Sequence, residues 1–506
     1  MDEQGRQLDT VRETEVKLTV PPDADLGALL DAGGTVSAVE EPTTAVLSST
    51  YFDTADLRLA REGITLRERV GDDEGWHLKV PAGAEGRHEI RAELGGDQPP
   101  AELLDLVTVH TRGEPVAPVA TLETTRVTRR LLGSDRKLLG VVVDDAVRVL
   151  SGDTERSSFR EIEVEAHPEV ADPAELLTEV TGRLVDAGAT LGEQMSKAVR
   201  ALGPAAQQPP TPPPASPLSD ADSAAAAVTA HLRNQARALM KHDMGVRRNL
   251  PDAVHQMRVS ARRFRSTLRT FRPLLDRPDD LAELSDELAW AADVLREVRD
   301  REVLLARLER DTAELPLPKK ERAALADQVA KRLGAEMTTA RAAVLDMLAG
   351  DRYRRLVDCL VAVATEPPLT TAADAPATEV VPALVEAAAE DLRKRAGRLN
   401  AESPDTAYHR ARIAAKRARY AGELAAPVFR PAKAYAQAAE AVQEILGEHQ
   451  DAAVAAETAR RLADGASAEV AFGLGMLAGY ERASAAAARA EIPGRWRDMN
   501  AVSLSL

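Results

Sequence analysis

A proline-rich segment, Gly203–Pro217, divides this 506-residue sequence into two halves with different hydrophobic periodicity. The segment includes the run Gln-Gln-Pro-Pro-Thr-Pro-Pro-Pro-Ala-Ser-Pro, which favours an extended linker without a core of its own. Apolar residues before it alternate with polar ones, whereas those after it recur at helical spacing. We therefore expect an α+β multidomain protein with a β domain over 1–202, a linker over 203–219 and an all-α domain over 220–500.

Short runs with a two-residue period fill the first half, and clusters of Gly, Asp and Pro separate them. The clearest runs are residues 13–20, 63–70, 76–80, 88–92, 138–143 and 159–166. Residues 173–200 have helical spacing instead. The pattern predicts an antiparallel β domain that ends in helix.

The first of these runs places Glu13, Glu15 and Lys17 at alternate positions. Alternate side chains of a strand point to the same face, so these three charges share one face. Such a face is a poor core but a good wall for a wet cavity. Carboxylates suit Mg²⁺ or Mn²⁺, and a lysine suits phosphate, so the run predicts a site for a metal ion and an anion.

A second acidic run, Glu161-x-Glu163-x-Glu165, is a candidate for the opposite wall. The runs between the two acidic ones are mainly basic. Their charged residues are Arg67, Arg69, Lys79, Arg87, Arg91, Arg126 and Arg129, followed by Asp144, Asp145 and Lys197. Same-face charges on successive strands predict a closed or nearly closed β-barrel with a polar lumen.

The first 202 residues resemble the CYTH family, the triphosphate tunnel metalloenzymes. Besides the two acidic runs, the resemblance rests on Tyr51-Phe52-Asp53-Thr54, Leu66-Arg67-x-Arg69, the segment around Lys79, and Ser196-Lys197. It implies an eight-stranded antiparallel tunnel that acts on a triphosphate, as an inorganic, thiamine or RNA triphosphatase or as an adenylate cyclase.

The resemblance also implies roles for single residues. Mg²⁺ or Mn²⁺ would be bound by Glu13, Glu15 and a carboxylate from Glu161 or Glu163. The phosphates would contact Lys17, Arg67, Arg69, Lys79, Arg126 and Lys197, and Asp145 would contact metal or water. Relatives often have a glutamate just before the Asp-Asp pair, where this chain has Val141-Val142-Val143. Metal affinity or substrate choice can differ for that reason.

The helical half contains an internal repeat. The segment from His255 to Arg265 matches the segment from His409 to Arg419, 154 residues later (409 minus 255). A second match, Leu295 to Asp300 with Leu446 to Asp451, has nearly the same spacing, 151 (446 minus 295). We therefore predict a duplicated four-helix bundle with repeats over about 220–365 and 376–500.

Each repeat has a basic stripe, because offsets 0, 3, 7 and 10 share one side of a helix. Such stripes attract a polyanion, and the scarcity of aromatic residues favours phosphate without bases. This half resembles the CHAD family, the conserved-histidine α-helical domain, also in Leu288-Ala-Trp290 and Gln443-x-x-Leu446-Gly447. The resemblance implies polyphosphate binding by His255, Arg258, Arg262, Arg263, Arg265, His409, Arg412, Lys416, Arg417 and Arg419. Arg299 and Asp300 would form a structural ion pair.

Composition excludes several classes of protein. The net charge of −16 and 3% aromatic content argue against a specific nucleic-acid binder. The single Cys359 excludes an intrachain disulfide framework. No apolar run reaches the roughly 20 residues of a membrane span, and Met1–Arg12 is too polar for a signal peptide. We expect a cytoplasmic protein, with polyphosphate granules as one place of association.

These observations together predict a metal-dependent triphosphatase joined to a polyphosphate-binding domain. Two alternatives stay open. One is a cyclase of the class IV type that converts ATP to cyclic AMP, although the sequence offers no signal for an adenine pocket. The other is a polyphosphate-binding scaffold whose tunnel has no activity.

Overall fold

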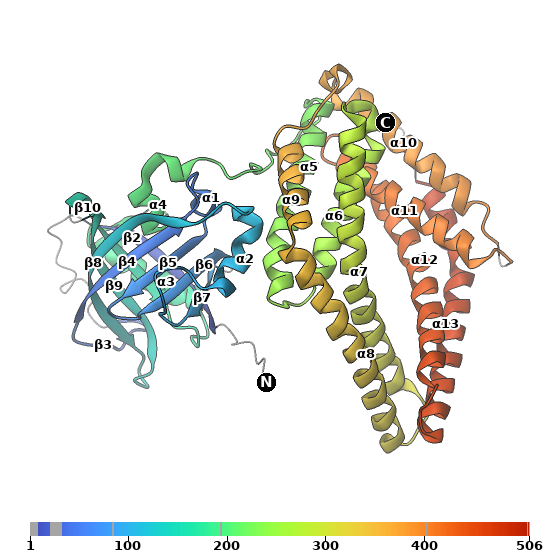
Figure 1. Cartoon of the computed structure of the whole chain (residues 1–506), viewed down its shortest axis with the longest axis horizontal. Coiled ribbons are helices and arrows are strands. Elements are labelled where there is room, and N and C mark those ends of the chain that lie inside the picture. The colour runs from blue at the N-terminus through green and yellow to red at the C-terminus, as the bar shows by residue number, and fades with distance from the viewer. Residues whose placement is uncertain are drawn as a thin grey trace. The chain divides into compact units, whose positions relative to one another are not determined.

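The computed structural model describes residues 9–20, 33–82, 86–152, 154–192, 195–400, 402–502 and 504, without the side chains of Asp9, Val11, Arg12 and Glu13. The chain forms two compact units, Met1–Pro210 and Thr211–Leu506 (Figure 1). The first is built around an antiparallel sheet and the second is helical, so the predicted fold class is confirmed.

The first unit has one sheet with the strand order β1-β7-β6-β5-β4-β8-β9-β10-β2-β11, and β3 pairs with β8. The strands are β1 Asp9–Glu13, β2 Glu15–Thr19, β3 Ala38–Val39, β4 Thr43–Asp53, β5 Thr65–Val70, β6 Gly75–Pro81, β7 Arg87–Ala92, β8 Ala117–Leu132, β9 Leu138–Ser151, β10 Thr154–Ala166 and β11 Thr190–Leu191. The helices are α1 Arg58–Arg61, α2 Ala101–Thr111, α3 Pro173–Asp186 and α4 Lys197–Leu202.

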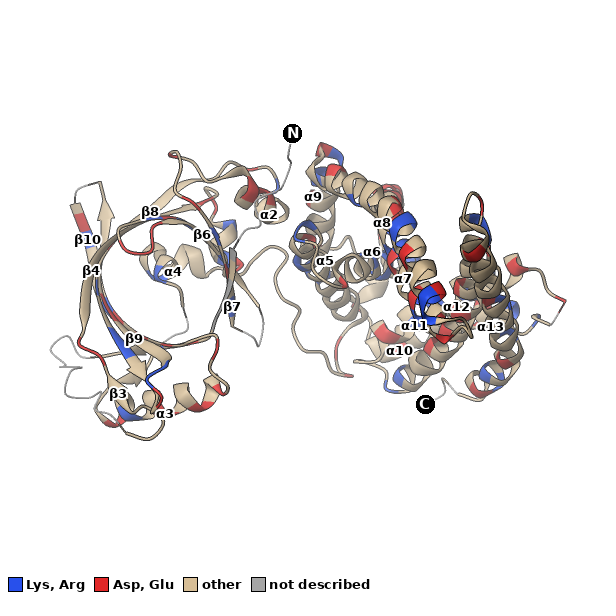
Figure 2. Ribbon diagram, turned by 90° about the horizontal axis from the view of Figure 1, so that it is seen from below, with Lys and Arg blue, Asp and Glu red and all other residues tan. Residues whose placement is uncertain are grey.

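Two consecutive segments of the chain join the opposite ends of the sheet. β1 pairs with β7, β2 pairs with β10, and only Thr14 separates β1 from β2. The list of hydrogen-bonded strand pairs does not close on itself. The two ends of the sheet are nevertheless joined through the chain, because β1 runs almost directly into β2, and the sheet forms a tunnel. Figure 2 shows these strands as a ring in cross-section. If β1 and β2 count as one interrupted strand and the two-residue β3 and β11 are set aside, the tunnel has the eight strands predicted.

The tunnel is apolar on the outside where helices cover it. Ile162 and Val164 of β10 are buried in one cluster with Leu176 and Val180 of α3. Asp172 caps α3 by accepting a hydrogen bond from the Glu175 amide at 2.9 Å, and Pro173 fits the first helical position. Because strand side chains alternate, this covered outer face leaves the intervening glutamates of β10 pointing into the tunnel.

One end of the tunnel interior is apolar. Helix α4 lies inside the ring of strands (Figure 2), where Ala198 packs against Tyr51, Leu122, Val147 and Val149. This packing fixes the start of α4, which places Lys197 at the boundary between the apolar and the charged part of the tunnel.

The second unit consists of two similar sets of helices. The first set is α5 Ala224–Arg247, α6 Ala253–Thr270, α7 Pro278–Glu314 and α8 Lys319–Ala349, followed by the shorter α9 Asp351–Thr365. The second set is α10 Ala377–Ala396, α11 Asp405–Ala425, α12 Pro431–Leu462 and α13 Ala468–Asn500. None of the described helices is both long and apolar enough to cross a membrane.

Reciprocal hydrogen bonds tie the two repeats together where each begins. The Ala224 amide donates to the Ala375 carbonyl at 3.0 Å, and the Ala377 amide donates to the Asp222 carbonyl at 2.9 Å. The two donor residues are 153 positions apart in the chain (377 minus 224), and so are the two acceptor residues (375 minus 222). Each repeat thus makes the same hydrogen bond to the other repeat, as a local two-fold relation requires.

Candidate functional site

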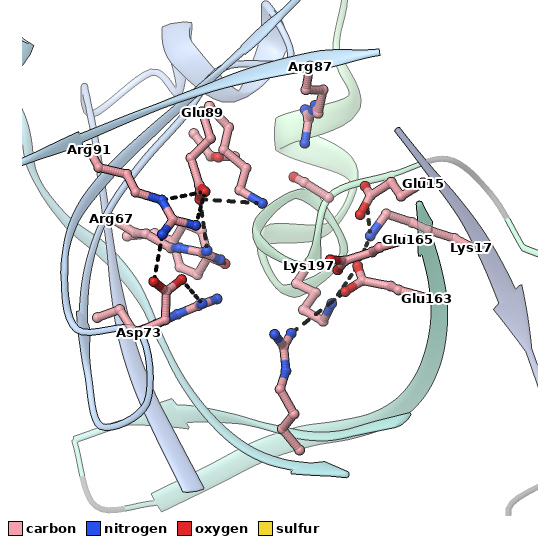
Figure 3. A pocket seen from close by; sticks show the side chains of 16 residues that line it. Glu15, Lys17, Arg67, Asp73, Arg87, Glu89, Arg91, Glu163, Glu165 and Lys197 are labelled. Carbon is pink, nitrogen blue, oxygen red and sulfur yellow. Dashed lines mark hydrogen bonds and ion pairs between the residues drawn. The ribbon is translucent and has the colours of Figure 1, made fainter. Parts of the chain in front are cut away.

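Three carboxylates gather on one wall of the tunnel. Glu165 of β10 lies directly opposite Glu15 of β2, and Glu163 lies opposite Lys17. The carboxylates of Glu15, Glu163 and Glu165 each offer an oxygen within 4.8 Å of the others. Figure 3 shows this acidic wall together with Lys17 and Lys197.

The electrostatics of this wall favour a bound cation. Burial raises the pKa of Glu165 to about 7, and the nearby charges of Glu163 and Glu15 act in the same direction. Like charges directly opposite each other on paired strands repel. A hard divalent cation removes that repulsion and prefers oxygen ligands, so the three residues fit such an ion.

Two lysines hold the same wall in place. Lys17 donates to Glu163 and, at 3.1 Å, to Glu161. Burial alone lowers the pKa of Lys17, but Glu163, Glu15 and Glu161 outweigh it and raise the pKa to about 12. Lys197 Nζ lies 2.6 Å from Glu163, 3.0 Å from Glu161 and 3.1 Å from Asp145. Both lysines are therefore fixed positive charges.

The opposite wall is organised around one buried carboxylate, Glu89, which is 1% exposed. Its oxygens lie 2.6 Å from Arg91, 3.0 Å from His77 Nδ1, and 3.6 Å from both Arg67 and Lys79. Burial opposes ionisation of Glu89, but the bond from His77 and the adjacent cations keep its pKa far below the usual range. Glu89 thus positions the basic side chains from β5, β6 and β7.

Two arginines of β5 have capacity left for an anion. Arg67 donates to the Tyr51 hydroxyl at 3.3 Å, and Arg69 to Asp73 at 3.3 Å. The Nε atoms of Arg67 and Arg69 are buried without a hydrogen-bond partner in the described part of the chain. Burial and the charges of Arg67 and Arg126 lower the pKa of Arg69 to about 10. Guanidinium groups that keep an unused N–H donor are suited to phosphate oxygens.

Asp145 has a supporting role. It is fully buried and accepts two hydrogen bonds from Arg126, at 2.9 and 2.7 Å, besides its contact with Lys197. Burial raises the pKa of Asp145, but Lys197 and Arg126 lower it by more. Asp145 orients Arg126 and Lys197, and it is not one of the three acids whose oxygens lie within 4.8 Å of one another.

The two walls enclose one cavity of about 100 Å³. Its lining includes most of the residues that the sequence singled out, namely Glu15, Lys17, Arg67, Arg69, Lys79, Arg126, Glu163 and Lys197. Glu161 is instead enclosed by Lys17, Lys197 and Arg200. The side chain of Glu13 lies outside the described residues.

Sequence reasoning gave no specific role to three residues of this cavity. Tyr51, Glu89 and Glu165 line it. The alternation Arg87-x-Glu89-x-Arg91 was the available signal for Glu89, and Glu161-x-Glu163-x-Glu165 was the signal for Glu165. Val143, in the valine run before Asp144, is the cross-strand neighbour of Glu163 and is buried.

The helical unit brings four of its predicted cations together across two helices. Arg258 and Arg262 of α6 and Arg412 of α11 are the charges that lower the pKa of Lys416 on α11, after burial. Arg258 lies 3.9 Å from Asp300, and Arg412 lies 3.9 Å from Asp451. These ion pairs occupy equivalent places in the two repeats.

The other predicted cations of the helical unit have separate partners. Arg263 and Arg419 both bond to Glu423, Arg417 pairs with Asp391, and Arg265 donates to Ser285. His409 contacts Gln450 at 3.2 Å, and burial with the nearby Arg299 lowers the pKa of His255.

Arg299 pairs with Glu302 and Asp252 but not with Asp300, so the predicted pair is wrong. Arg299 and Asp300 are consecutive residues of one helix, so their side chains point in different directions and meet different partners.

Comparison with known proteins agrees with both units. The model of the CYTH domain matches residues 11–188, and that of the CHAD domain matches residues 230–460. The uncharacterized protein Rv2226 of Mycobacterium tuberculosis is 34% identical over 477 residues, 90% of this chain and 88% of that protein. PptA from Streptomyces chartreusis is 26% identical, with a TM-score of 0.46 over 56% of this chain and 100% of that one. The CHAD domain from the plant Ricinus communis is 28% identical, with a TM-score of 0.48 over 59% and 98%.

Proposed function

Because this chain belongs to the family of proteins that join a CYTH domain to a CHAD domain, we propose that its tunnel hydrolyses a triphosphate and its helical unit binds inorganic polyphosphate. CYTH domains are metal-dependent and include triphosphatases and cyclases. The observation that supports the proposal best is the cavity itself, in which Glu15, Glu163 and Glu165 face a wall of arginine and lysine side chains (Figure 3).

In this proposal Glu15, Glu163 and Glu165 hold the cofactor, Mg²⁺ or Mn²⁺. A bound ion would polarise phosphoryl oxygens and lower the pKa of a coordinated water. Arg67, Arg69 and the lysines neutralise the charge that spreads over the phosphate oxygens as the anhydride bond breaks. Because Glu89 and Asp145 already hold these basic side chains in position, the side chains need to move little during the reaction.

A phosphate-release assay tests the tunnel. Purified protein is given tripolyphosphate, thiamine triphosphate, ATP or long-chain polyphosphate, each with Mg²⁺ or Mn²⁺. We expect release from at least one short triphosphate and loss of that release in a Glu15→Ala, Glu165→Ala double variant. Glu155→Gln is the matched control, because Glu155 is an exposed acid on the same strand β10.

The products separate the two enzyme classes. Orthophosphate from ATP or tripolyphosphate supports hydrolysis, whereas cyclic AMP with pyrophosphate would assign the tunnel to the cyclases. Turnover of every substrate no faster than in the double variant would leave only the scaffold role.

Polyphosphate binding by the helical unit is tested by reversing charge in its basic cluster. We expect the Arg262→Glu, Lys416→Glu double variant to lose binding of long-chain polyphosphate. Arg460→Glu is the control, because Arg460 is an exposed arginine of α12 that pairs with Glu457, one helical turn earlier. Binding that survives the double reversal would place the site elsewhere.

A further inference from the structure

The two repeats of the helical unit have the same cationic pattern with one substitution. Arg258 and Arg412 are equivalent and each lies 3.9 Å from an aspartate of the following helix. One turn further along each helix, the first repeat has Arg262 and the second has Lys416, 154 residues later (416 minus 262). An arginine remains protonated in proteins, whereas a lysine can lose its proton when buried. The cluster therefore contains one position that can change charge.

Lys416 is surrounded by positive charge. Arg258 and Arg262 face it from α6 and Arg412 from its own helix, whereas Asp451 of α12 is the negative charge that acts on it in the opposite direction. Within the described part of the chain, no carboxylate oxygen lies within 4.0 Å of Lys416 Nζ.

The other helices packed on α11 direct their charges to other partners: Asp391 of α10 pairs with Arg417, and His231 of α5 lies near Glu423 and Arg263. Lys416 thus has cationic neighbours without a closely paired acid.

The equivalent arginine has a hydroxyl partner that the lysine lacks. Arg262 donates to the Tyr420 hydroxyl at 2.8 Å. The position equivalent to Tyr420 in the first repeat is Ser266 (420 minus 154), whose buried Oγ has no hydrogen-bond partner among the described residues. Burial, and then Arg262, Arg412 and Arg258, lower the pKa of Lys416 to about 6. Loss of the Lys416 proton relieves a repulsion that the arginines cannot relieve.

We propose that polyphosphate binding to this cluster is coupled to the uptake of one proton by Lys416, so that the affinity for polyphosphate falls as the pH rises. The inference rests on the proposed polyphosphate-binding function. In the bound state, phosphate oxygens take the place of the missing carboxylate. The Nζ lone pair of Lys416 accepts a proton from solvent, and the resulting ammonium group donates hydrogen bonds to those oxygens.

The sign of the effect follows from linkage. Below about pH 6 Lys416 is already charged in the free protein, so its titration makes no difference to binding there. Above that pH a proton must be added on binding, and each further pH unit weakens binding by about tenfold until the bound lysine also titrates.

The test compares the full-length protein with three variants, using long-chain polyphosphate without divalent metal at constant ionic strength between pH 6 and pH 9. Lys416→Arg should lose the pH dependence, so that its affinity at pH 8 equals its own affinity at pH 6. Lys416→Met should bind weakly at every pH, and the affinity of wild type should fall towards this level by pH 9. Arg262→Lys, the matched change in the other repeat, should make the decline with pH steeper.

Proton uptake can also be measured directly by calorimetry. Binding heats at pH 7.5 in buffers of different ionisation enthalpy should report about one proton taken up by wild type and about none by Lys416→Arg. A wild-type affinity that does not depend on pH would overturn the inference, as would the same pH dependence in Lys416→Arg. The latter result would assign the dependence to a group other than Lys416. Absence of polyphosphate binding at every pH would instead refute the proposed function of the helical unit.

Discussion

The lysines of the two units differ in their charge compensation. In the tunnel, Lys17 and Lys197 each contact two or more carboxylates, and the pKa of both is raised. In the helical unit, Lys416 has arginines around it, and its pKa is lowered to about 6. All three lysines are at least partly buried, so burial does not explain the difference. The presence or absence of a paired acid decides whether a buried lysine is a fixed charge or a titrating one.

The largest expected difference between the units is in stability. Asp145→Asn removes a fully buried carboxylate charge that both Arg126 and Lys197 contact, so we expect the tunnel unit to lose about 3–5 kcal/mol of unfolding free energy. The control is Asp391→Asn, which breaks pairs with Arg395 and Arg417 at a site where the aspartate is 25% exposed. That change should cost about 1 kcal/mol or less. Hydrogen exchange, followed for each unit by mass spectrometry in increasing urea, measures both losses, and equal losses would contradict the comparison.

The next effect is on catalysis. Glu163 belongs to the acidic group and contacts both Lys17 and Lys197. Glu163→Gln should lower phosphate release at saturating metal by about 100-fold, as loss of one preorganised electrostatic contact typically does. Glu155→Gln on the same strand should change the rate by less than about twofold. Comparable rates in both variants would mean that the acidic group has no part in the reaction.

A third effect concerns pH and has opposite signs in the two units. Glu165, with its pKa raised to about 7, must lose its proton before a cation binds. Mn²⁺ affinity, measured without substrate, should therefore rise by about tenfold per unit up to pH 7 and then level off. The same shift means that the metal-free tunnel loses stability as pH rises from 4.5 through 7, because the folded state holds this proton more tightly.

Glu165→Gln tests that assignment. The variant should bind Mn²⁺ more weakly and without the slope below pH 7. A slope that persists in Glu165→Gln would assign the titration to another acid of the group. Polyphosphate binding, in contrast, should weaken as pH rises, because its coupled group is a cation.

Periodicity in the sequence was sufficient for the fold class and for the faces of the strands, whereas the number of strands in the tunnel came from the resemblance to the CYTH family. Glu163 and Lys17 were predicted to point into a lumen because charges at alternate positions cannot all face a core. The choice among Glu161, Glu163 and Glu165 needed the register of β10 against β2, which puts Glu165 rather than Glu161 opposite Glu15. Register depends on pairing between strands that are about 150 residues apart in the chain, and a single sequence gives no measure of it.

The internal repeat made the equivalent stripes of α6 and α11 predictable, but not the partners of each cation. Spacing on a helix shows which side chains share a face, whereas their acidic partners come from other helices or from later turns. Glu423 is such a partner, since it binds Arg263 from α6 and Arg419 from its own helix. Members of one stripe therefore differ in how much charge they have available for a polyanion.

The smallest expected effect separates these two kinds of arginine. Arg263 donates to both oxygens of Glu423, at 2.9 and 3.1 Å, whereas Arg412 lies 3.9 Å from Asp451. We expect Arg412→Ala to weaken polyphosphate binding by about tenfold and to reduce the slope of log affinity against log salt by about 0.7, the loss of roughly one phosphate contact. Arg263→Ala should weaken binding by less than about threefold and leave the salt slope unchanged, because its charge is already neutralised. Titrations at several salt concentrations measure both quantities, and an equal change of slope in the two variants would show that pairing with Glu423 does not remove Arg263 from the binding surface.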